Sequence, residues 1–173
     1  MDVHALPPAE RFPYRRGVVG PAGTASLGER IASLLTGGEI ILLWGALGAG
    51  KTCFSQGLAR GLGITGEVAS PTFTLVNTYP GQPTLHHLDF YRIDAEHDLT
   101  DIGVPEILDE VWDGTAVAVV EWPGPLLPSL GPQPRCELLV LPGQSAEERI
   151  WHLAGVPSVP PAWAALFGGG SPC

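Results

Sequence analysis

The sequence predicts an α/β fold, in which helices pack against a β-sheet. Two continuous apolar runs, 39–44 (EIILLW) and 116–122 (AVAVVEW), are typical of strands that are buried on both faces of a sheet. The segments 71–79 and 83–92, joined by Pro-Gly-Gln, have the composition of a β-hairpin. After the first run, apolar residues recur every four positions, as on one face of a helix (Phe54, Leu58 and Leu62).

The elements of the N-terminal half follow in chain order. The first 20 residues contain proline and arginine and are expected to form an extended lead-in. Ser26 and Glu29 make an S-x-x-E capping pattern, so a helix is expected to begin there and to end at Gly37-Gly38. The strand 39–44 comes next, and a second helix is expected to begin near Lys51 and to stop by Gly63.

The C-terminal half contains an acidic segment and two further strands. Residues 94–113 hold eight carboxylates and no Lys or Arg, and the apolar residues among them suggest short amphipathic helices. This acidic segment is either a docking face or a solvated helical face, and the second interpretation is at least as good. The segments 135–141 and 148–153 are typical of strands, and the Pro/Gly-rich segment 157–173 is expected to be a flexible tail with a short helix at 162–167.

Length and composition predict one globular domain. A chain of 173 residues with 45% hydrophobic residues suits a single domain, expected at 21–156 between a lead-in (1–20) and a tail (157–173). No apolar run is long enough to cross a bilayer, and the N-terminus lacks the apolar core of a secretory signal. The three cysteines are widely spaced and fit neither a disulfide framework nor a zinc site. A cytoplasmic protein without membrane contact is therefore expected.

Charge argues against a broad nucleic-acid surface. The chain has 9 basic and 18 acidic residues, which gives a net charge of −9. Nucleic-acid binding needs clustered Lys and Arg. Lys51 is the only lysine in the sequence, and its position in a glycine-rich stretch makes it the first candidate for function.

That stretch, LLWGALGAGKTCF, contains a phosphate-binding motif. Gly45 is followed by four residues and then by Gly50, Lys51 and Thr52, which is the spacing G-x-x-x-x-G-K-[ST]. It also lies between an expected strand and an expected helix, which is the context that the motif requires. The backbone N–H groups of such a loop bind phosphates, the lysine reaches the β- and γ-phosphates, and the hydroxyl binds Mg²⁺. Binding of a nucleoside triphosphate is therefore predicted.

Phosphoryl chemistry also needs carboxylates, and two are candidates. Glu121 follows a buried strand and is expected at the edge of the sheet where ligands bind. Asp89 shares one face of its strand with His87; its alternative interpretation is a solvated edge-strand carboxylate. His86 and His87 are better interpreted as strand or surface histidines than as a metal pair. Ser70-Pro71-Thr72 is either a switch near the γ-phosphate or a turn that begins a strand.

Three classes of nucleotide protein compete. A GTPase is excluded because its guanine-specifying Asn-Lys-x-Asp needs a second lysine. A small-molecule kinase is weaker because the chain lacks an arginine-rich lid segment after the loop. The remaining class is an ATPase whose hydrolysis drives a partner, and the small-molecule kinase is kept as the alternative.

The order and spacing of GALGAGKT, SPTFTLV, HLDFYR and VEWP resemble the TsaE (YjeE-type) family over roughly residues 24–153. The resemblance implies a P-loop NTPase-like three-layer sandwich with a mixed, partly antiparallel sheet. It implies an ATPase, with ATP and Mg²⁺ as cofactors, that serves threonylcarbamoyl modification of adenosine in tRNA. It further implies TsaD and TsaB proteins as partners, with tRNA involved only indirectly, and weak activity in the isolated chain.

The resemblance also assigns residues. By this likeness Lys51, Glu121 and Asp89 are catalytic, and Thr52, Glu121 and Asp89 hold Mg²⁺. The loop residues expected to contact ATP are Ala46, Leu47, Gly48, Ala49, Gly50, Lys51 and Thr52. Two further positions, Thr24 and Arg149, are expected near the nucleotide base. Two departures stand out. Many family members have Asp at Ala46, whose side chain the phosphate cradle does not require, and an acidic or polar residue at Gly124, which leaves Glu121 as the acidic residue there.

Overall fold

The computed structural model describes residues 2–94 and 99–168. It contains one sheet with strand order β1-β7-β6-β2-β5-β4-β3. The central strands β6 (Arg135–Pro142), β2 (Ile40–Trp44), β5 (Ala116–Glu121) and β4 (Thr84–Asp89) run parallel to one another. The outer strands β1 (Tyr14–Val19), β7 (Glu148–Val156) and β3 (Val76–Tyr79) pair antiparallel with their neighbours. The expected mixed sheet is confirmed.

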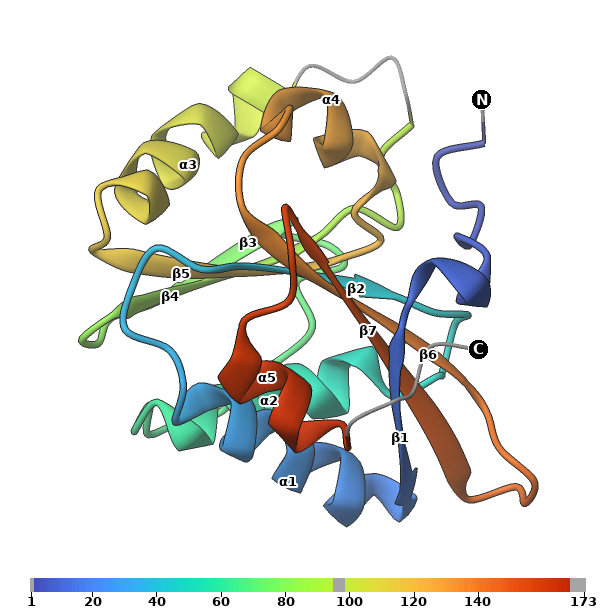
Figure 1. Ribbon diagram of the computed structural model, residues 1–173. Helices are drawn as coiled ribbons and strands as arrows, with labels where there is room; N and C mark the ends of the chain where they lie inside the picture. The colour runs from blue at the N-terminus through green and yellow to red at the C-terminus, as the bar shows by residue number, and fades with distance from the viewer. Residues whose placement is uncertain (1, 95–98, 169–173) are drawn as a thin grey trace.

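Helices cover both faces of the sheet, so the molecule has three layers (Figure 1). One face carries α1 (Gly20–Ala32), α2 (Lys51–Gly61) and α5 (Pro161–Leu166), and the other carries α3 (Val104–Trp112) and α4 (Leu127–Leu130). Alternate residues of β2 serve the two cores: Ile41 and Leu43 pack toward α1 and α2, while Ile40 and Leu42 pack toward α3. A strand buried on both faces needs an unbroken apolar sequence, which is what 39–44 supplies.

The helices α1 and α2 touch through glycines. A Cβ added to Gly57 would lie 2.0 Å from the Ala25 carbonyl oxygen, and one added to Gly28 would lie 2.4 Å from the Phe54 carbonyl oxygen. The two backbones are therefore in direct contact. Because α2 begins at Lys51 inside the glycine-rich loop, this close packing fixes the orientation of the helix end that faces the loop.

Three expectations about the N-terminal half and the tail need correction. Residues 14–19 form β1, hydrogen-bonded to β7, so the sheet includes part of the segment expected to be a lead-in, and the boundary at residue 21 is too late. The helix α1 begins at Gly20 with Pro21 in its first turn, so Ser26 and Glu29 lie inside it and form no capping box. The pairing of β1 with β7, about 130 residues later in the chain, determines where α1 begins. The sequence around residue 20 carries no sign of this long-range pairing.

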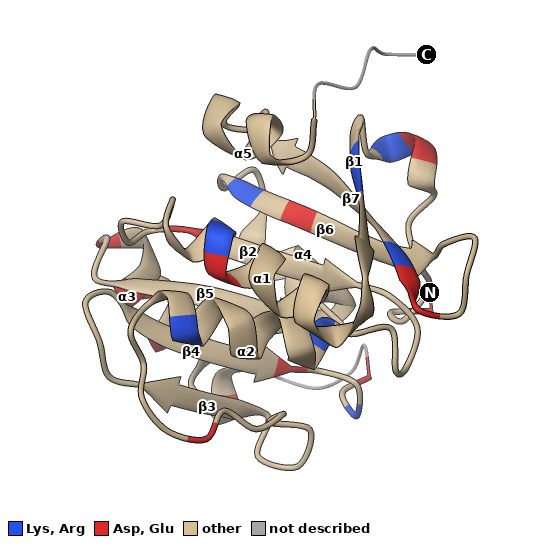
Figure 2. Ribbon diagram, turned by 90° about the horizontal axis from the view of Figure 1, so that it is seen from below, with Lys and Arg blue, Asp and Glu red and all other residues tan. Residues whose placement is uncertain are grey.

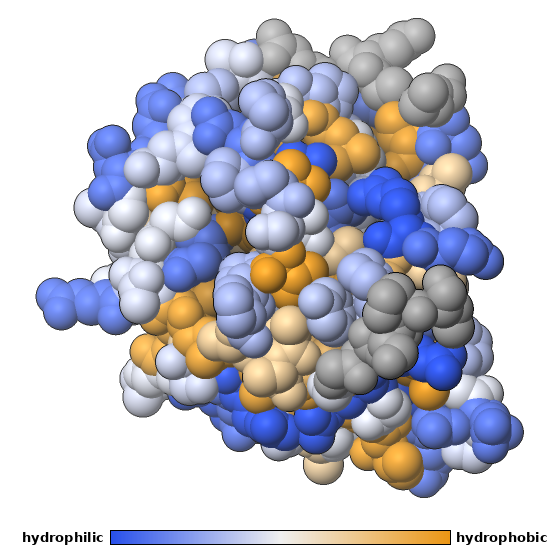
Figure 3. Space-filling view, viewed as in Figure 1, coloured by the Kyte–Doolittle hydropathy of each residue, from blue (hydrophilic) through white to orange (hydrophobic). Residues whose placement is uncertain are grey.

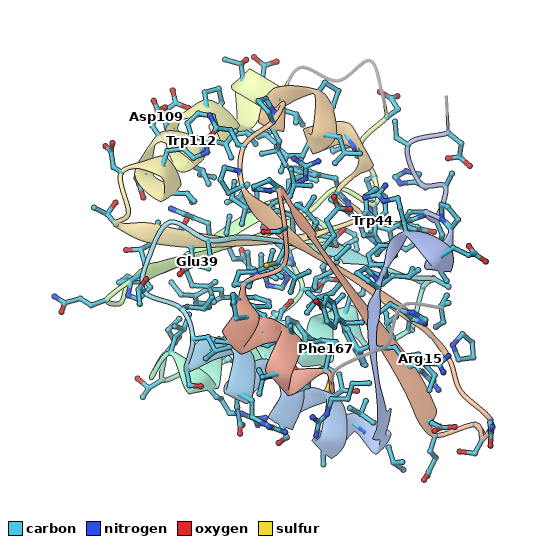
Figure 4. All side chains as sticks on the ribbon, viewed as in Figure 1. Arg15, Glu39, Trp44, Asp109, Trp112 and Phe167 are labelled. Carbon is cyan, nitrogen blue, oxygen red and sulfur yellow. The ribbon has the colours of Figure 1, made fainter. Side chains whose placement is uncertain are left out.

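The tail is partly ordered and part of the core. Trp163 of α5 and Phe167 (labelled in Figure 4), which follows the helix, are each 3% exposed and belong to the core that contains residues of α1 and α2. The expectation of a flexible segment from residue 157 is wrong for these residues. Residues 169–173 of the tail and 95–98 of the acidic segment lie outside the described residues. In the part of the chain that the structure describes, no helix is both long and apolar enough to cross a membrane.

Candidate active site

The carboxyl ends of three parallel strands place the site. The glycine-rich loop follows β2, Glu121 is the last residue of β5, and Asp89 is the last residue of β4. In the register of the sheet, Asp89 lies opposite Glu121. Parallel strands bring the loop and both carboxylates to one edge of the sheet, which is where ligands bind in open α/β folds.

The loop has the backbone that a phosphate cradle needs. Gly48 and Gly50 have φ values of 75° and 110°, which side chains disfavour. A Cβ on Gly45 would come within 2.5 Å of a Val140 methyl group, so this position also accepts only glycine. Helix α2 starts directly after Gly50, and its first N–H groups and positive end face the loop. This arrangement is suited to binding an anion.

Lys51 is buried at the centre of the loop and is 4% exposed. Its Nζ donates to the carbonyl oxygens of Gly45, at 2.8 Å, and Ala46, at 2.9 Å, and lies 4.2 Å from the centre of the Trp122 ring. Burial lowers the pKa of this ammonium group, and the charges of Glu121 and Asp89 counteract that lowering. The two carbonyl groups offer the ammonium group only dipoles, whereas a phosphate would offer it a full negative charge.

A hydroxyl–carboxylate pair lies beside the lysine. The Thr52 hydroxyl is 3.1 Å from Glu121 Oε1 and 3.2 Å from Oε2. Glu121 is 3% exposed, and His87 Nε2 lies 2.9 Å from its Oε1. Oxygen donors of this kind are the ligands that Mg²⁺ prefers, and Mg²⁺ takes further oxygens from phosphates. The residues present therefore fit a nucleotide-bound magnesium ion.

Asp89 has its own set of partners. Its Oδ2 accepts hydrogen bonds from the hydroxyls of Ser70, at 3.1 Å, and Thr72, at 2.8 Å, while Oδ1 accepts from the N–H of Tyr91 at 2.9 Å. Asp89 is 3% exposed and lies on an interior strand, so the alternative of a solvated edge-strand carboxylate is excluded. The same segment opens the turn expected before a strand, since the Leu75 N–H donates to the Pro71 carbonyl oxygen and β3 begins at Val76.

These groups line one cleft of about 300 Å³, which holds residues from the loop, from both carboxylate strands and from the Ser70–Thr72 segment. No arginine is among the described residues that line it. A second cavity of about 230 Å³ adjoins the loop and is lined by Thr24 and Arg149 together with Gly48 and Gly50. The structure thus brings Thr24 and Arg149 to the far side of the loop, away from the two carboxylates.

Sequence reasoning gave no role in the site to Trp122 and treated His87 as a strand or surface histidine. Trp122 follows Glu121 with a φ of 54°, a left-handed conformation that is rare for a non-glycine residue, and its ring covers Lys51. His87 is fully buried against Glu121. His87 lies two residues before Asp89 and therefore on the same face of the strand, and this spacing could have placed His87 in the site from the sequence. His86 faces away from the site and contacts Glu110 of α3.

The parallel central strands, the loop between β2 and α2, and the buried lysine define a P-loop NTPase fold. A family model described as threonylcarbamoyl adenosine biosynthesis protein TsaE matches residues 19–150. The chain therefore belongs to the TsaE family.

Individual relatives agree with the family match. The tRNA threonylcarbamoyladenosine biosynthesis protein TsaE of Treponema pallidum is 50% identical over 99 residues, covering 57% of this chain and 70% of the relative. The protein of the same name from Bacillus subtilis is 38% identical over 137 residues, covering 79% and 82%. The crystal structure of YdiB from Bacillus subtilis superposes with a TM-score of 0.67 at 31% identity, covering 88% of this chain and 89% of YdiB.

Proposed function

We propose that this chain is the Mg-ATP-dependent ATPase of the machinery that makes N6-threonylcarbamoyladenosine at position 37 of tRNA. In this proposal, ATP hydrolysis drives turnover of a threonylcarbamoyl-transferase complex of TsaD and TsaB proteins, and the chain itself touches tRNA only indirectly. Membership of the TsaE family supports the pathway. The free cysteines Cys53 and Cys136 fit a reducing cytoplasm.

The observation that carries the proposal is the meeting of Lys51, Thr52 and Glu121 at the loop. Lys51 Nζ lies at the loop carbonyl groups, and Thr52 and Glu121 are within 3.2 Å of each other. When ATP is bound, Lys51 would exchange its carbonyl partners for phosphate oxygens, and the loop N–H groups from Ala46 to Thr52 would hold the remaining ones. Mg²⁺, when bound, would neutralise phosphate charge beside Thr52 and Glu121.

Asp89 is the second carboxylate of the cleft. Its hydrogen bonds to Ser70 and Thr72 fix its orientation, and from there it would orient the attacking water or support the metal. Thr24 and Arg149 line the adjoining cavity on the far side of the loop, and we assign this cavity to the nucleoside. No arginine is among the described residues that line the cleft, so this chain supplies no arginine there to stabilise the charge that develops on the phosphates during hydrolysis. We therefore expect slow hydrolysis by the isolated chain.

The test is phosphate release from Mg-ATP by the purified chain, alone and with TsaD and TsaB proteins, with Lys51→Ala as control. Slow release alone, a large increase with the partners and loss in the variant are expected. Turnover of about 10 s⁻¹ by the chain alone, a typical enzyme rate, would contradict partner dependence. ATP consumption only with a small acceptor, which becomes phosphorylated, would instead establish the small-molecule kinase.

A further inference from the structure

His87 of β4 hydrogen-bonds to the Glu121 carboxylate. Its imidazole is fully buried, with Nε2 at 2.9 Å from Glu121 Oε1. A carboxylate only accepts hydrogen bonds, so Nε2 carries the hydrogen and donates it. Nδ1 is then left buried without a hydrogen-bond partner among residues 2–94 and 99–168. Burial of a half-satisfied polar ring costs stability.

The same carboxylate is held from its other side by Thr52. Glu121 therefore sits between a hydroxyl of α2 and an imidazole of β4, with both of its oxygens near Thr52 and one near His87. If ligand binding draws Thr52 away, the His87 contact alone keeps the carboxylate in place. Groups that hydrogen-bond to a metal-binding carboxylate in this way fix its orientation and raise its affinity for the metal.

We propose that His87 is a positioning residue that orients Glu121 toward the divalent cation of the bound nucleotide. This role rests on the proposed function, because it requires a cation at Thr52 and Glu121. His87 itself touches neither nucleotide nor metal, and it acts by donating a hydrogen bond from Nε2. A side chain that reaches the same point and donates, such as glutamine, should therefore replace it, whereas leucine of similar size should not.

The test measures Mn²⁺ binding in the presence of ADP from the loss of the free-Mn²⁺ resonance signal, so it needs no turnover. His87→Leu is expected to weaken Mn²⁺ binding about 10- to 100-fold, the range for loss of an outer hydrogen bond to a metal ligand. His87→Gln is expected to bind Mn²⁺ with nearly the affinity of the unchanged protein. The affinity for ADP without metal is expected to be the same in every variant. His86→Leu is the matched control, since it removes a buried histidine one position away that faces Glu110.

Two results would overturn this role: a His87→Leu protein that binds Mn²⁺ as tightly as the unchanged one, or a His87→Gln protein that loses as much as His87→Leu. Thermal unfolding of each variant separates these results from misfolding. If the unchanged protein shows no Mn²⁺ binding linked to ADP, the proposed function fails and the role of His87 fails with it.

A different observation concerns residues 2–5, here named the N-terminal strap. The His4 ring packs edge-on against Trp122, with 5.5 Å between ring centres, and lies 6.0 Å from the ring of Tyr91. Trp122 and Tyr91 both line the cleft. A Cβ on Gly124 would lie 1.8 Å from the Val3 carbonyl oxygen, so the strap can lie here only because residue 124 has no side chain.

The chain behind the strap is firmly anchored. Arg11 pairs at 2.6 Å with Glu137, a carboxylate that is 1% exposed and also accepts from the Trp44 indole, and Phe12 is 5% exposed. The strap therefore extends from a fixed point on the sheet to the wall of the cleft. We infer that it holds Trp122 and Tyr91 in their present positions and so slows the release of nucleotide from the cleft, a role that rests on the proposed function.

The test measures dissociation of a fluorescent ADP analogue. Deletion of residues 2–5 and Gly124→Ala should each speed release by about 2- to 10-fold, the range for loss of ring contacts. Combining the two should add nothing further, because both remove the same contact. Gly23→Ala, whose added Cβ meets only ordinary contacts, is the control. Unchanged release after deletion, or an additive double variant, would overturn the inference, whereas an analogue that does not bind the unchanged protein at all would overturn the proposed function.

Discussion

At the scale of single residues, Lys51 combines burial with two carboxylates and an aromatic ring. Its ammonium group lies over the Trp122 ring, and the charges of Glu121 and Asp89 keep its pKa from falling as far as burial alone would take it. Its Nζ donates hydrogen bonds to the Gly45 and Ala46 carbonyl oxygens of the loop. These contacts fix the position of the ammonium group within the loop, which limits the ordering that phosphate binding requires.

Lys51→Met is expected to weaken ATP binding by about 10- to 100-fold, because hydrogen bonds from a charged donor are worth about 1.5–3 kcal/mol. Lys51→Arg should retain little of the ATP affinity, since the planar guanidinium group does not fit a space shaped for one ammonium group. Equilibrium binding of a fluorescent ATP analogue measures both, with thermal unfolding as a check on folding. Affinity within twofold of the unchanged protein in Lys51→Met would exclude the lysine from phosphate binding.

At the scale of elements, the order of the strands explains which residues were predictable. The loop and Glu121 follow from local patterns, because apolar runs mark buried strands and parallel strands end at one edge. The start of α1 and the role of β1 do not, because pairing of β1 with β7 sets them over a long sequence distance. The Glu121 contacts of His87 and Thr52 likewise join three elements, so their geometry is beyond any local pattern.

The helix α5 gives a prediction about stability. Trp163→Ala should lower the free energy of unfolding by about 3–5 kcal/mol, because it empties a buried aromatic site next to α1 and α2. Phe73→Ala is the matched control: Phe73 is 82% exposed, and a change within about 0.5 kcal/mol is expected. Urea unfolding at pH 7 measures both. Equal effects would mean that the segment after β7 contributes nothing to the core.

The pairing of β1 with β7 gives a prediction about pH. His152 of β7 pairs in register with Arg15 of β1, which is labelled in Figure 4, and burial, with a smaller effect of Arg15, lowers the pKa of His152 below 6.5. The unfolded chain therefore takes up a proton before the folded one does. Above pH 6.5, His152 should not affect the free energy of unfolding. As the pH falls from 6.5 to the lowered pKa of the folded state, His152 should progressively lower that free energy.

Replacement of His152 by glutamine should remove part of the loss of stability between pH 7 and pH 5. Urea unfolding of both proteins across that range measures the difference. Parallel pH profiles for the two would show that His152 has the same pKa in the folded and unfolded chains.

At the scale of the whole molecule, charge is spread rather than concentrated. The net charge is −9, and basic residues are scattered over several elements instead of lining one face (Figure 2). Polar and apolar residues are likewise interspersed over the face seen in Figure 3. Of three arginines near the N-terminus, Arg11 pairs with Glu137 and Arg16 donates to the Leu166 carbonyl oxygen. Little basic surface remains for nucleic acid.

The chain alone is accordingly expected to bind tRNA more weakly than about 100 µM at physiological salt, the weak end of non-specific affinity. Filter binding at 50 mM and 200 mM salt measures it. Micromolar binding with a steep salt dependence would reveal phosphate contacts that the charge distribution does not provide, and tRNA would then be a direct partner.

The most direct test of the central claim is a crystal structure of the chain with Mg-ADP. We expect the β-phosphate inside the loop at the N-terminal end of α2, within hydrogen-bond distance of Lys51 Nζ. The metal is expected at the Thr52 hydroxyl and, directly or through water, at Glu121. A nucleotide bound elsewhere, or one whose phosphates leave Lys51 on the Gly45 and Ala46 carbonyl groups, would contradict the assignment of this cleft as the ATP site.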